Sequence, residues 1–512
     1  MRTPDTVSRD RLPSLMARRG PASASSLAAE LGVSVATLHR LLQERAGELV
    51  SAGLARRSRH ALRRRLRGGA SALPLASIDA QGRAHDAGQL VLVQPAGCWL
   101  PLQQFSGMPW PLPKPAPGAL RDPLHDAVRD GWWPGLPYPL QDLRPQGYLG
   151  RQLARAGHAA WGVSPDPQRW SDDDALHVLS QAGSDGPGNL VVGEPAIARW
   201  QAQRLAQAEP LAPAALGPAY TALAEQAVAA GVAGSSAAGE FPKFPALRDR
   251  AGADTAHVLV KFSGAGGSAA EQRWADLLVC EHLALQTLKG QIDLPGQAGQ
   301  PPVRAAHSAV VQHAGRTFLE VERFDRHGLW GRSPLVSLAT LDGTFLGQGS
   351  GDWPRLADAL VSQGLVDAAA LPAITQLWWF GRLIANTDMH TGNLSFQALP
   401  RAAVGGTLAA GLLAPANALA PAQTLAPAQA LTLAPAYDML PMAYAPLPGG
   451  EVAPRAFMPA SPPPAQRAVW LAACSAAISF WRRAAADSRI SEGFRATAAA
   501  NAQALTGLID QV

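Results

Sequence analysis

Two side chains near residue 390 have the types and spacing that phosphoryl transfer requires. Asp388 and Asn393 are separated by four residues within the polar segment 386–396. In a kinase catalytic loop, an Asp orients the attacking hydroxyl as the catalytic base, and an Asn at this spacing binds magnesium. An ordinary polar loop that caps a helix would also use Asp and Asn, because both residues favour turns. The segment by itself leaves both interpretations open.

The segments around this loop must position its side chains. Residues 374–385 form an apolar helical run before the loop, and residues 394–396 form a short strand-like segment after it. A further carboxylate, Asp438, follows the strand-like segment 431–433, in the place of the metal-binding Asp of a kinase. The pattern predicts that Asn393 and Asp438 hold a magnesium ion.

Upstream, a lysine interrupts an apolar strand. Lys261 lies within the strand predicted over 258–262, where an amine needs a partner. Glu281, in the helix predicted over 274–288, can pair with it, as in the kinase strand whose Lys holds the ATP phosphates. The small residues of 231–244 would let backbone N–H groups approach a phosphate. This order of loop, lysine strand and glutamate helix favours a kinase N-lobe.

A strand predicted over 318–326 is followed by a loop at the position where a kinase hinge would lie. Backbone groups near Glu322 and Phe324 could then meet the adenine of ATP, although an edge strand with alternating charge fits the same residues. Five residues in kinase order favour a phosphotransferase over a chance alignment. They are Lys261, Glu281, Asp388, Asn393 and Asp438.

The beginning of the chain has the pattern of a winged helix-turn-helix. Two amphipathic helical segments flank Gly32, which permits a tight turn between them. The second helix would enter the major groove of DNA, and an arginine-rich wing would neutralise phosphates. A helical domain that packs on a neighbour is the alternative. The predicted DNA-binding residues are Ser34, Thr37, His39, Arg40, Arg56, Arg57 and Arg59.

Composition narrows the class of protein. The 512 residues carry a net charge of +5, and 47% of them are hydrophobic, which suffices for several buried cores. Three widely separated cysteines form neither a metal site nor a disulfide framework, so we expect a reducing, cytoplasmic location. Closely spaced prolines interrupt the uncharged stretch 402–437, which excludes a membrane span. Asp172–Asp174 are expected to begin a helix, with a three-carboxylate metal site as the less favoured interpretation.

Four segments resemble the HipA family, the serine/threonine-protein kinases of bacterial type II toxin–antitoxin systems. They are residues 236–243, 321–326, 386–395 and 433–438. The fused N-terminal helix-turn-helix and residues 140–151 resemble the YjjJ branch of that family. The resemblance implies an α+β, bilobal protein-kinase-like fold with an N-terminal winged helix-turn-helix domain. It implies ATP and Mg²⁺ as cofactors, and Asp388 as the catalytic base.

The resemblance also implies roles for other residues and partners. A loop serine, Ser236, would be autophosphorylated. The implied ATP-binding residues are Lys261, Glu281, Glu322, Phe324, Ser236, Gly239 and His390, and the implied metal ligands are Asn393 and Asp438. The implied partners are a protein substrate, which is an aminoacyl-tRNA synthetase in the best-known branch, and DNA, with an antitoxin as a further candidate. No membrane partner is expected.

The predicted boundaries divide the chain into four parts. They are residues 1–68 for the DNA-binding domain, 69–155 for a Pro/Trp-rich subdomain, 156–326 for an N-lobe-like region, and 327–512 for a helical C-lobe with a low-complexity insert at 402–432. Gly392 stands where loops of the family often carry Lys. Two alternatives therefore stay open: a nucleotide-sensing, DNA-binding transcription regulator with a weak or inactive kinase fold, and a kinase of small molecules.

Overall fold

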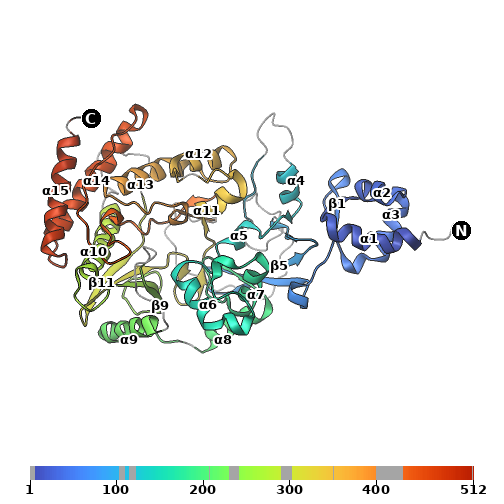
Figure 1. Cartoon of the computed structure of the whole chain (residues 1–512), viewed down its shortest axis with the longest axis horizontal. Coiled ribbons are helices and arrows are strands. Elements are labelled where there is room, and N and C mark those ends of the chain that lie inside the picture. The colour runs from blue at the N-terminus through green and yellow to red at the C-terminus, as the bar shows by residue number, and fades with distance from the viewer. Residues whose placement is uncertain are drawn as a thin grey trace, which may run out of the picture.

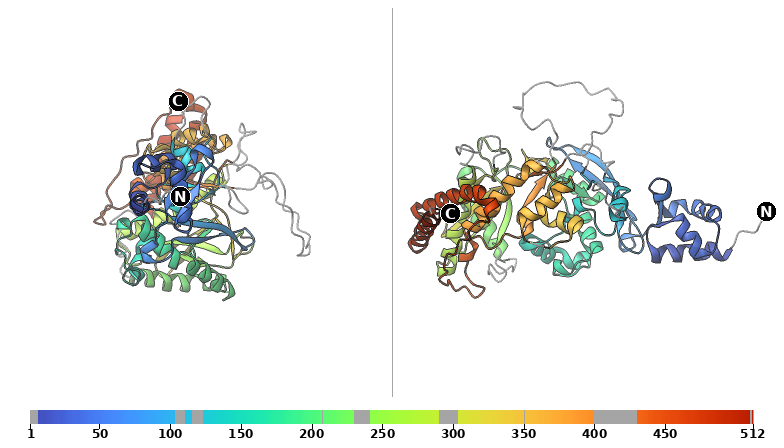
Figure 2. Two further views of the ribbon diagram at one scale, coloured as in Figure 1. Left: turned by 90° about the vertical axis from the view of Figure 1, so that its right-hand side faces the viewer. Right: turned by 90° about the horizontal axis from the view of Figure 1, so that it is seen from above.

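The structure, a computed structural model, combines helices with several small antiparallel sheets (Figure 1). It describes residues 6–102, 110–114, 123–206, 208–229, 241–289, 303–349, 351–398, 430–509 and 511. Ser236, Gly239 and most of the insert predicted at 402–432 lie outside these residues. The N-terminal unit stands apart at one end, and the C-terminal helices form the opposite end (Figure 2).

The N-terminal unit contains three helices and a three-stranded sheet. The helices are α1 (Thr6–Arg19), α2 (Ala24–Leu31) and α3 (Val35–Glu44), and the strands are β1 (Ala22–Ser23), β2 (Leu49–Ala52) and β3 (Arg59–Leu62). Gly32 ends α2 with a φ of 70°, a conformation that costs glycine little. The Ser34 side chain caps α3 by accepting from the N–H of Thr37. Leucines from all three helices are buried together, which gives the unit its own core.

The middle part is organised around a five-stranded antiparallel sheet with the order β7-β6-β5-β4-β8. The strands are β4 (Ala72–Ile78), β5 (Ala84–Leu92), β6 (Cys98–Trp99), β7 (Trp132–Trp133) and β8 (Leu190–Val192). The helices are α4 (Pro123–Arg129), α5 (Tyr138–Gln141), α6 (Gly147–Trp161), α7 (Asp172–Ala182) and α8 (Glu194–Leu205). Because β8 pairs with β4, the sheet draws on both sides of the boundary predicted at residue 155.

The acidic triplet begins α7, as the sequence predicts. Ser171 and Asp174 form a reciprocal capping box at its first turn. Each carboxylate of the triplet pairs with an arginine of another segment: Asp172 with Arg144, Asp173 with Arg64 and Asp174 with Arg67. Among the described residues, no group of three or more His, Cys, Asp and Glu side chains could hold a metal ion. The triplet therefore joins segments of the protein.

A four-stranded antiparallel sheet with the order β11-β12-β10-β9 follows. Its strands are β9 (Lys243–Leu247), β10 (His257–Phe262), β11 (Ser308–His313) and β12 (Arg316–Glu322), and its helices are α9 (Leu216–Ala229) and α10 (Ala269–Lys289). The strand predicted over 318–326 thus ends earlier, at Glu322. Val258, Val260 and Phe262 pack with α9 on one face. Side chains alternate along a strand, so Lys261 lies on the other face, toward α10.

The C-terminal part is mainly helical and is built around buried tryptophans, including Trp353, Trp470 and Trp481. Its helices are α11 (Leu338–Leu341), α12 (Trp353–Ser362), α13 (Leu371–Leu383), α14 (Arg467–Ala486) and α15 (Glu492–Ile509). Its short strands are β13 (Arg326–His327), β14 (Gly331–Arg332), β15 (Val336–Ser337), β16 (Ser395–Gln397) and β17 (Thr432–Leu433). Among the described residues, no helix is both long and apolar enough to cross a membrane.

Candidate active site

The lysine of β10 meets two carboxylates that come from distant segments. Lys261 Nζ lies 2.8 and 2.7 Å from the two carboxylate oxygens of Glu281, which is fully buried in α10. The same amine also pairs with Asp438 Oδ1. The structure therefore brings together three of the five residues that the sequence places in kinase order.

Charge balance explains why a lysine is stable here. Burial by itself would lower the pKa of Lys261, but Asp438 and Glu281 raise it above its usual value. Burial would likewise raise the pKa of Asp438, yet Lys261 and Lys243 hold it below its ordinary range. The pKa of Glu281 is raised by burial, although Lys261 opposes that effect. The site therefore presents a protonated amine beside an ionised Asp438.

The loop of residues 386–393 follows the end of α13, and Asn386 connects it to Asp438. The side-chain nitrogen of Asn386 donates to the backbone oxygen of Asp438 at 3.2 Å, and its oxygen accepts from the N–H of Asp388 at 3.0 Å. Asn393 closes the loop by donating to the backbone oxygen of Asp388 at 2.9 Å. The oxygen of the Asn393 amide is then the atom that could ligate a metal ion.

Asp388 is half-buried, with 48% of its side chain exposed. Its Oδ1 is 4.0 Å from His390 Nε2. Burial raises the pKa of Asp388; His390 opposes this effect, and the nearby Asp438 adds to it. An exposed carboxylate with a raised pKa, beside the lysine and the second carboxylate, suits a general base.

The side chains of Phe324 and Glu322 differ in their direction: the Phe324 ring lies beside Tyr437, whereas the Glu322 side chain points away from the site. The Phe324 ring lies 5.6 Å from the Tyr437 ring, and the Phe324 backbone oxygen accepts from Gln397 at 3.2 Å. The Glu322 side chain is buried against Arg248, with which it forms an ion pair. Because Glu322 follows the alternation of β12 toward α9, only its backbone is available to a nucleotide.

Sequence reasoning missed three residues of this site. Lys243 in β9 stands directly opposite Lys261 in the sheet register, and its charge lowers the pKa of Asp438. Tyr437 donates to the Gly392 backbone oxygen at 2.7 Å, which connects Phe324 to the loop 386–393. Asn386 is the third. The signals in the sequence were weak: Lys243 and Tyr437 stand inside family-like segments, but their partners are defined only by tertiary contacts.

These residues fit a magnesium–nucleotide complex. The carboxylate of Asp438 and the amide oxygen of Asn393 are hard oxygen donors, which magnesium prefers. Lys261 and Lys243 supply two positive charges for phosphate oxygens. His390 turns its Nδ1 inward to accept from the N–H of Gly392 at 3.1 Å, so this ring stabilises the turn at residues 391–393.

Comparisons with known proteins show the family to which the chain is similar. The family model described as YjjJ-like toxin, middle domain, matches residues 69–201, and that described as HipA-like C-terminal domain matches residues 235–503. The chain is 34% identical over 478 residues to Toxin YjjJ of Escherichia coli (strain K12), and the match covers 93% of both proteins.

Two solved structures are similar to parts of the chain. One is the complex of HipA, HipB and operator DNA from Shewanella oneidensis MR-1, with a TM-score of 0.44, 15% identity and coverage of 86% of this chain and 97% of that one. The other is the Helicobacter pylori proinflammatory kinase CtkA, with a TM-score of 0.24, 13% identity and coverage of 39% and 54%. From the family models and the sequence identity, the chain belongs to the HipA family and, within it, to the YjjJ-like toxins.

Proposed function

We propose that this toxin is an ATP- and magnesium-dependent kinase that phosphorylates serine or threonine of a protein. The observation that supports this proposal most strongly is the buried amine of Lys261, which pairs with both Glu281 and Asp438. A lysine paired with a helix glutamate, near a metal-binding aspartate, is the arrangement that kinases use to hold the phosphates of ATP.

Each residue of the site has a defined part in this reaction. The bound magnesium–ATP complex supplies the phosphoryl group. Lys261 binds phosphate oxygens, while Asn393 and Asp438 would hold magnesium. Asp388 orients the substrate hydroxyl and accepts its proton as the new oxygen–phosphorus bond forms and the bond to ADP breaks. The Phe324 segment would contact the adenine, and His390 would lie beside the phosphates.

The direct test is transfer of label from γ-labelled ATP to protein by the purified chain in the presence of magnesium. We expect labelling of the chain itself or of proteins in a bacterial extract. Binding of ATP without any labelled protein would contradict the kinase proposal and favour a nucleotide-sensing regulator. Release of ADP with metabolites but not with protein would favour a small-molecule kinase. Gly392, in place of the Lys that loops of the family often carry, is the reason for testing this alternative.

The pH profile of the kinase should reflect the raised pKa of Asp388. A base works only when it is deprotonated, so kcat/KM should fall as the pH drops through the pKa of Asp388. This pKa is higher than the value of about 3.9 for an ordinary Asp. His390 lowers the pKa of Asp388, so His390→Gln should move the acidic limb to higher pH. Rate measurements across pH check this. His313→Gln, on the hairpin between β11 and β12, serves as the control, and an equal shift in that variant would contradict the assignment.

DNA binding by the N-terminal unit is a second proposed function. Helices α1–α3 and the sheet β1-β3-β2 of this unit support the proposal of a winged helix-turn-helix, and His39 and Arg40 are exposed on α3. The wing arginines differ in their surroundings. Arg57 pairs with Asp126 and Asp130 of the middle part, so that guanidinium is already engaged within the chain. We therefore place the principal phosphate contacts at Arg40 and Arg59; Ser34 and Thr37 would reach the DNA from the start of α3.

Salt dependence tests this DNA-binding proposal. The slope of log K against log salt should weaken by about 0.9 for each phosphate that is no longer neutralised, so Arg40→Ala with Arg59→Ala should weaken it by roughly two. Arg483→Ala in α14, at the opposite end of the molecule, should leave the slope unchanged (Figure 2). Titrations of a labelled DNA duplex at several salt concentrations measure it. A slope that the substitutions at Arg40 and Arg59 do not alter would favour a packing domain.

The remaining proposals concern partners and organisation. The kinase substrate would be a cytoplasmic protein, with an aminoacyl-tRNA synthetase as the first candidate to examine, and an antitoxin could regulate the toxin. The four parts proposed are residues 1–68, 69–155, 156–326 and 327–512. Family membership supports the substrate and antitoxin proposals, because the chain matches a named toxin along most of its length. The buried free cysteines are consistent with a reducing compartment.

A further inference from the structure

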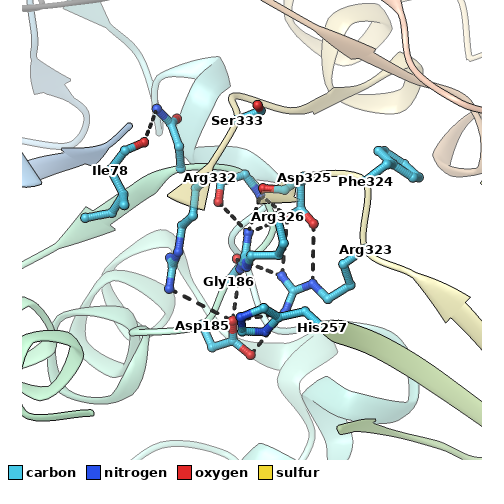
Figure 3. Close-up of polar contacts among 12 residues, drawn as sticks. Ile78, Asp185, Gly186, His257, Arg323, Phe324, Asp325, Arg326, Arg332 and Ser333 are labelled. Carbon is cyan, nitrogen blue, oxygen red and sulfur yellow. Dashed lines mark hydrogen bonds and ion pairs between the residues drawn. The ribbon is translucent and has the colours of Figure 1, made fainter. Parts of the chain in front are cut away.

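A charge cluster connects the middle part of the chain to the segment that carries Phe324. We define this Asp185 cluster as Asp185, Arg323, Asp325, Arg326 and Arg332 (Figure 3). Asp185 lies in the loop between α7 and β8, whereas the other four residues follow β12. Arg323 Nη1 donates to both carboxylate oxygens of Asp185, at 2.9 and 3.0 Å. Arg326 Nη2 donates to Asp185 Oδ1 at 2.9 Å.

The backbone of the same loop adds further contacts. Arg326 donates to the backbone oxygens of Gly186 at 2.6 Å and Gly188 at 2.9 Å, and Arg332 donates to that of Ser184 at 2.6 Å. In the opposite direction, the N–H of Gly188 donates to Asp325 Oδ2 at 2.8 Å. Residues 184–188 therefore hold the Phe324 segment through both carboxylates and three carbonyl groups.

The cluster has more positive than negative charge, so the Asp185 carboxylate is important for balancing its guanidinium groups. Three guanidinium groups face two carboxylates, so the net charge is +1 (3 − 2). The side chains of Arg326 and Arg332 are only 1% and 5% exposed. Among the described residues, Arg326 Nε and Arg332 Nη1 are buried without a hydrogen-bond partner. Without the Asp185 carboxylate, three cations would share only Asp325, and Arg323 Nη1 would lose both of its carboxylate contacts.

Phe324 lies between the two anchored neighbours, Arg323 and Asp325. Figure 3 shows its ring pointing away from the cluster. On that other side, the ring lies beside Tyr437, whose hydroxyl contacts the catalytic loop at Gly392. The contacts of its two neighbours with the loop 184–188, which is about 140 residues away in the sequence, therefore help to position Phe324, together with its own contacts to Tyr437 and Gln397.

We propose that Asp185 is a positioning residue of the nucleotide site, which acts through Arg323 to hold the Phe324 segment in the geometry that binds adenine. This inference rests on the proposed nucleotide binding and adds that the middle part of the chain completes the site. Asp185 touches no nucleotide itself. Its loss should weaken the binding of ATP, whereas the chemistry at Asp388 should be little affected once ATP is bound.

The experiment measures ATP–magnesium affinity by calorimetry, and KM and kcat for ATP, in the full-length chain. For Asp185→Asn we expect affinity to fall and KM to rise about tenfold, with kcat at saturating ATP nearly unchanged. Asp185→Glu, which keeps the carboxylate, should restore most of the affinity. Asp358→Asn, at an exposed aspartate of α12 outside the cluster, is the control, and its affinity should match that of the wild type.

Loss of folding is separated from loss of positioning by a charge-matched variant. Asp185→Asn combined with Arg332→Gln restores the net charge of +1 but not the ion pair with Arg323, so it should fold and still bind ATP weakly. Wild-type affinity in this double variant, or in a folded Asp185→Asn protein, would overturn the inference while leaving the kinase proposal intact. Failure of the wild-type chain to bind ATP would overturn the proposed function and this inference together.

Discussion

Asp388→Ala is expected to lower the rate of phosphoryl transfer by roughly 100- to 10,000-fold, because it removes the general base of the reaction. The same substitution should leave folding and ATP binding nearly unchanged. The Asp388 side chain is 48% exposed and lies 4.0 Å from His390, so its removal leaves no buried group unpaired. Lys261, Asn393 and Asp438 remain in place to bind the magnesium–nucleotide complex.

Single-turnover transfer from γ-labelled ATP, measured beside calorimetric ATP binding, checks this expectation. Asp358→Ala is the matched control, since Asp358 is an exposed aspartate on α12, away from the site. An unchanged rate of phosphoryl transfer in Asp388→Ala would show that Asp388 is not the general base. In cells, a growth defect that persists with Asp388→Ala would indicate that toxicity depends on nucleotide sensing or DNA binding, and not on phosphorylation.

Lys261→Met is expected to lower the free energy of unfolding by about 3–5 kcal/mol. Glu281 is fully buried and Lys261 is 5% exposed, so the substitution leaves Glu281, and also the 26% exposed Asp438, without their cation. Adding Glu281→Leu removes the fully buried carboxylate but not Asp438, so it should recover part of the lost stability, because a buried pair can be replaced by apolar groups of similar size. Neither variant should bind ATP, since the amine that binds the phosphates is absent from both.

Urea unfolding monitored by tryptophan fluorescence gives the two free energies, and calorimetry gives the binding. Lys289→Met, at the end of α10, is the control and should cost about 1 kcal/mol or less. If Lys261→Met is as stable as the wild type, the buried Glu281 carboxylate does not need the Lys261 amine for its stability. A double variant that is no more stable than the single one would mean that packing, and not the unpaired charge, accounts for the loss.

The sequence by itself determined the local chemistry of this protein. The spacing of Asp388 and Asn393, the lysine within an apolar strand and the capped start of α7 all depend on residues a few positions apart. Such patterns are readable because helix and strand periodicity, capping and turn formation are short-range effects. The Ser34 cap of α3 is another such short-range contact, since Ser34 accepts from an N–H three residues later.

Contacts between distant segments were decided only by the tertiary structure. Arg64 and Arg67 stand in a run of arginines that follows the predicted wing, and in the fold they pair with Asp173 and Asp174 of α7. The alternation of β12 turns Glu322 toward Arg248, and the sheet register places Lys243 opposite Lys261. The partner of Arg323, Asp185, lies 138 residues earlier in the chain. Which charges meet across such distances depends on strand register and on packing between the parts, and neither is encoded in the local pattern of residues.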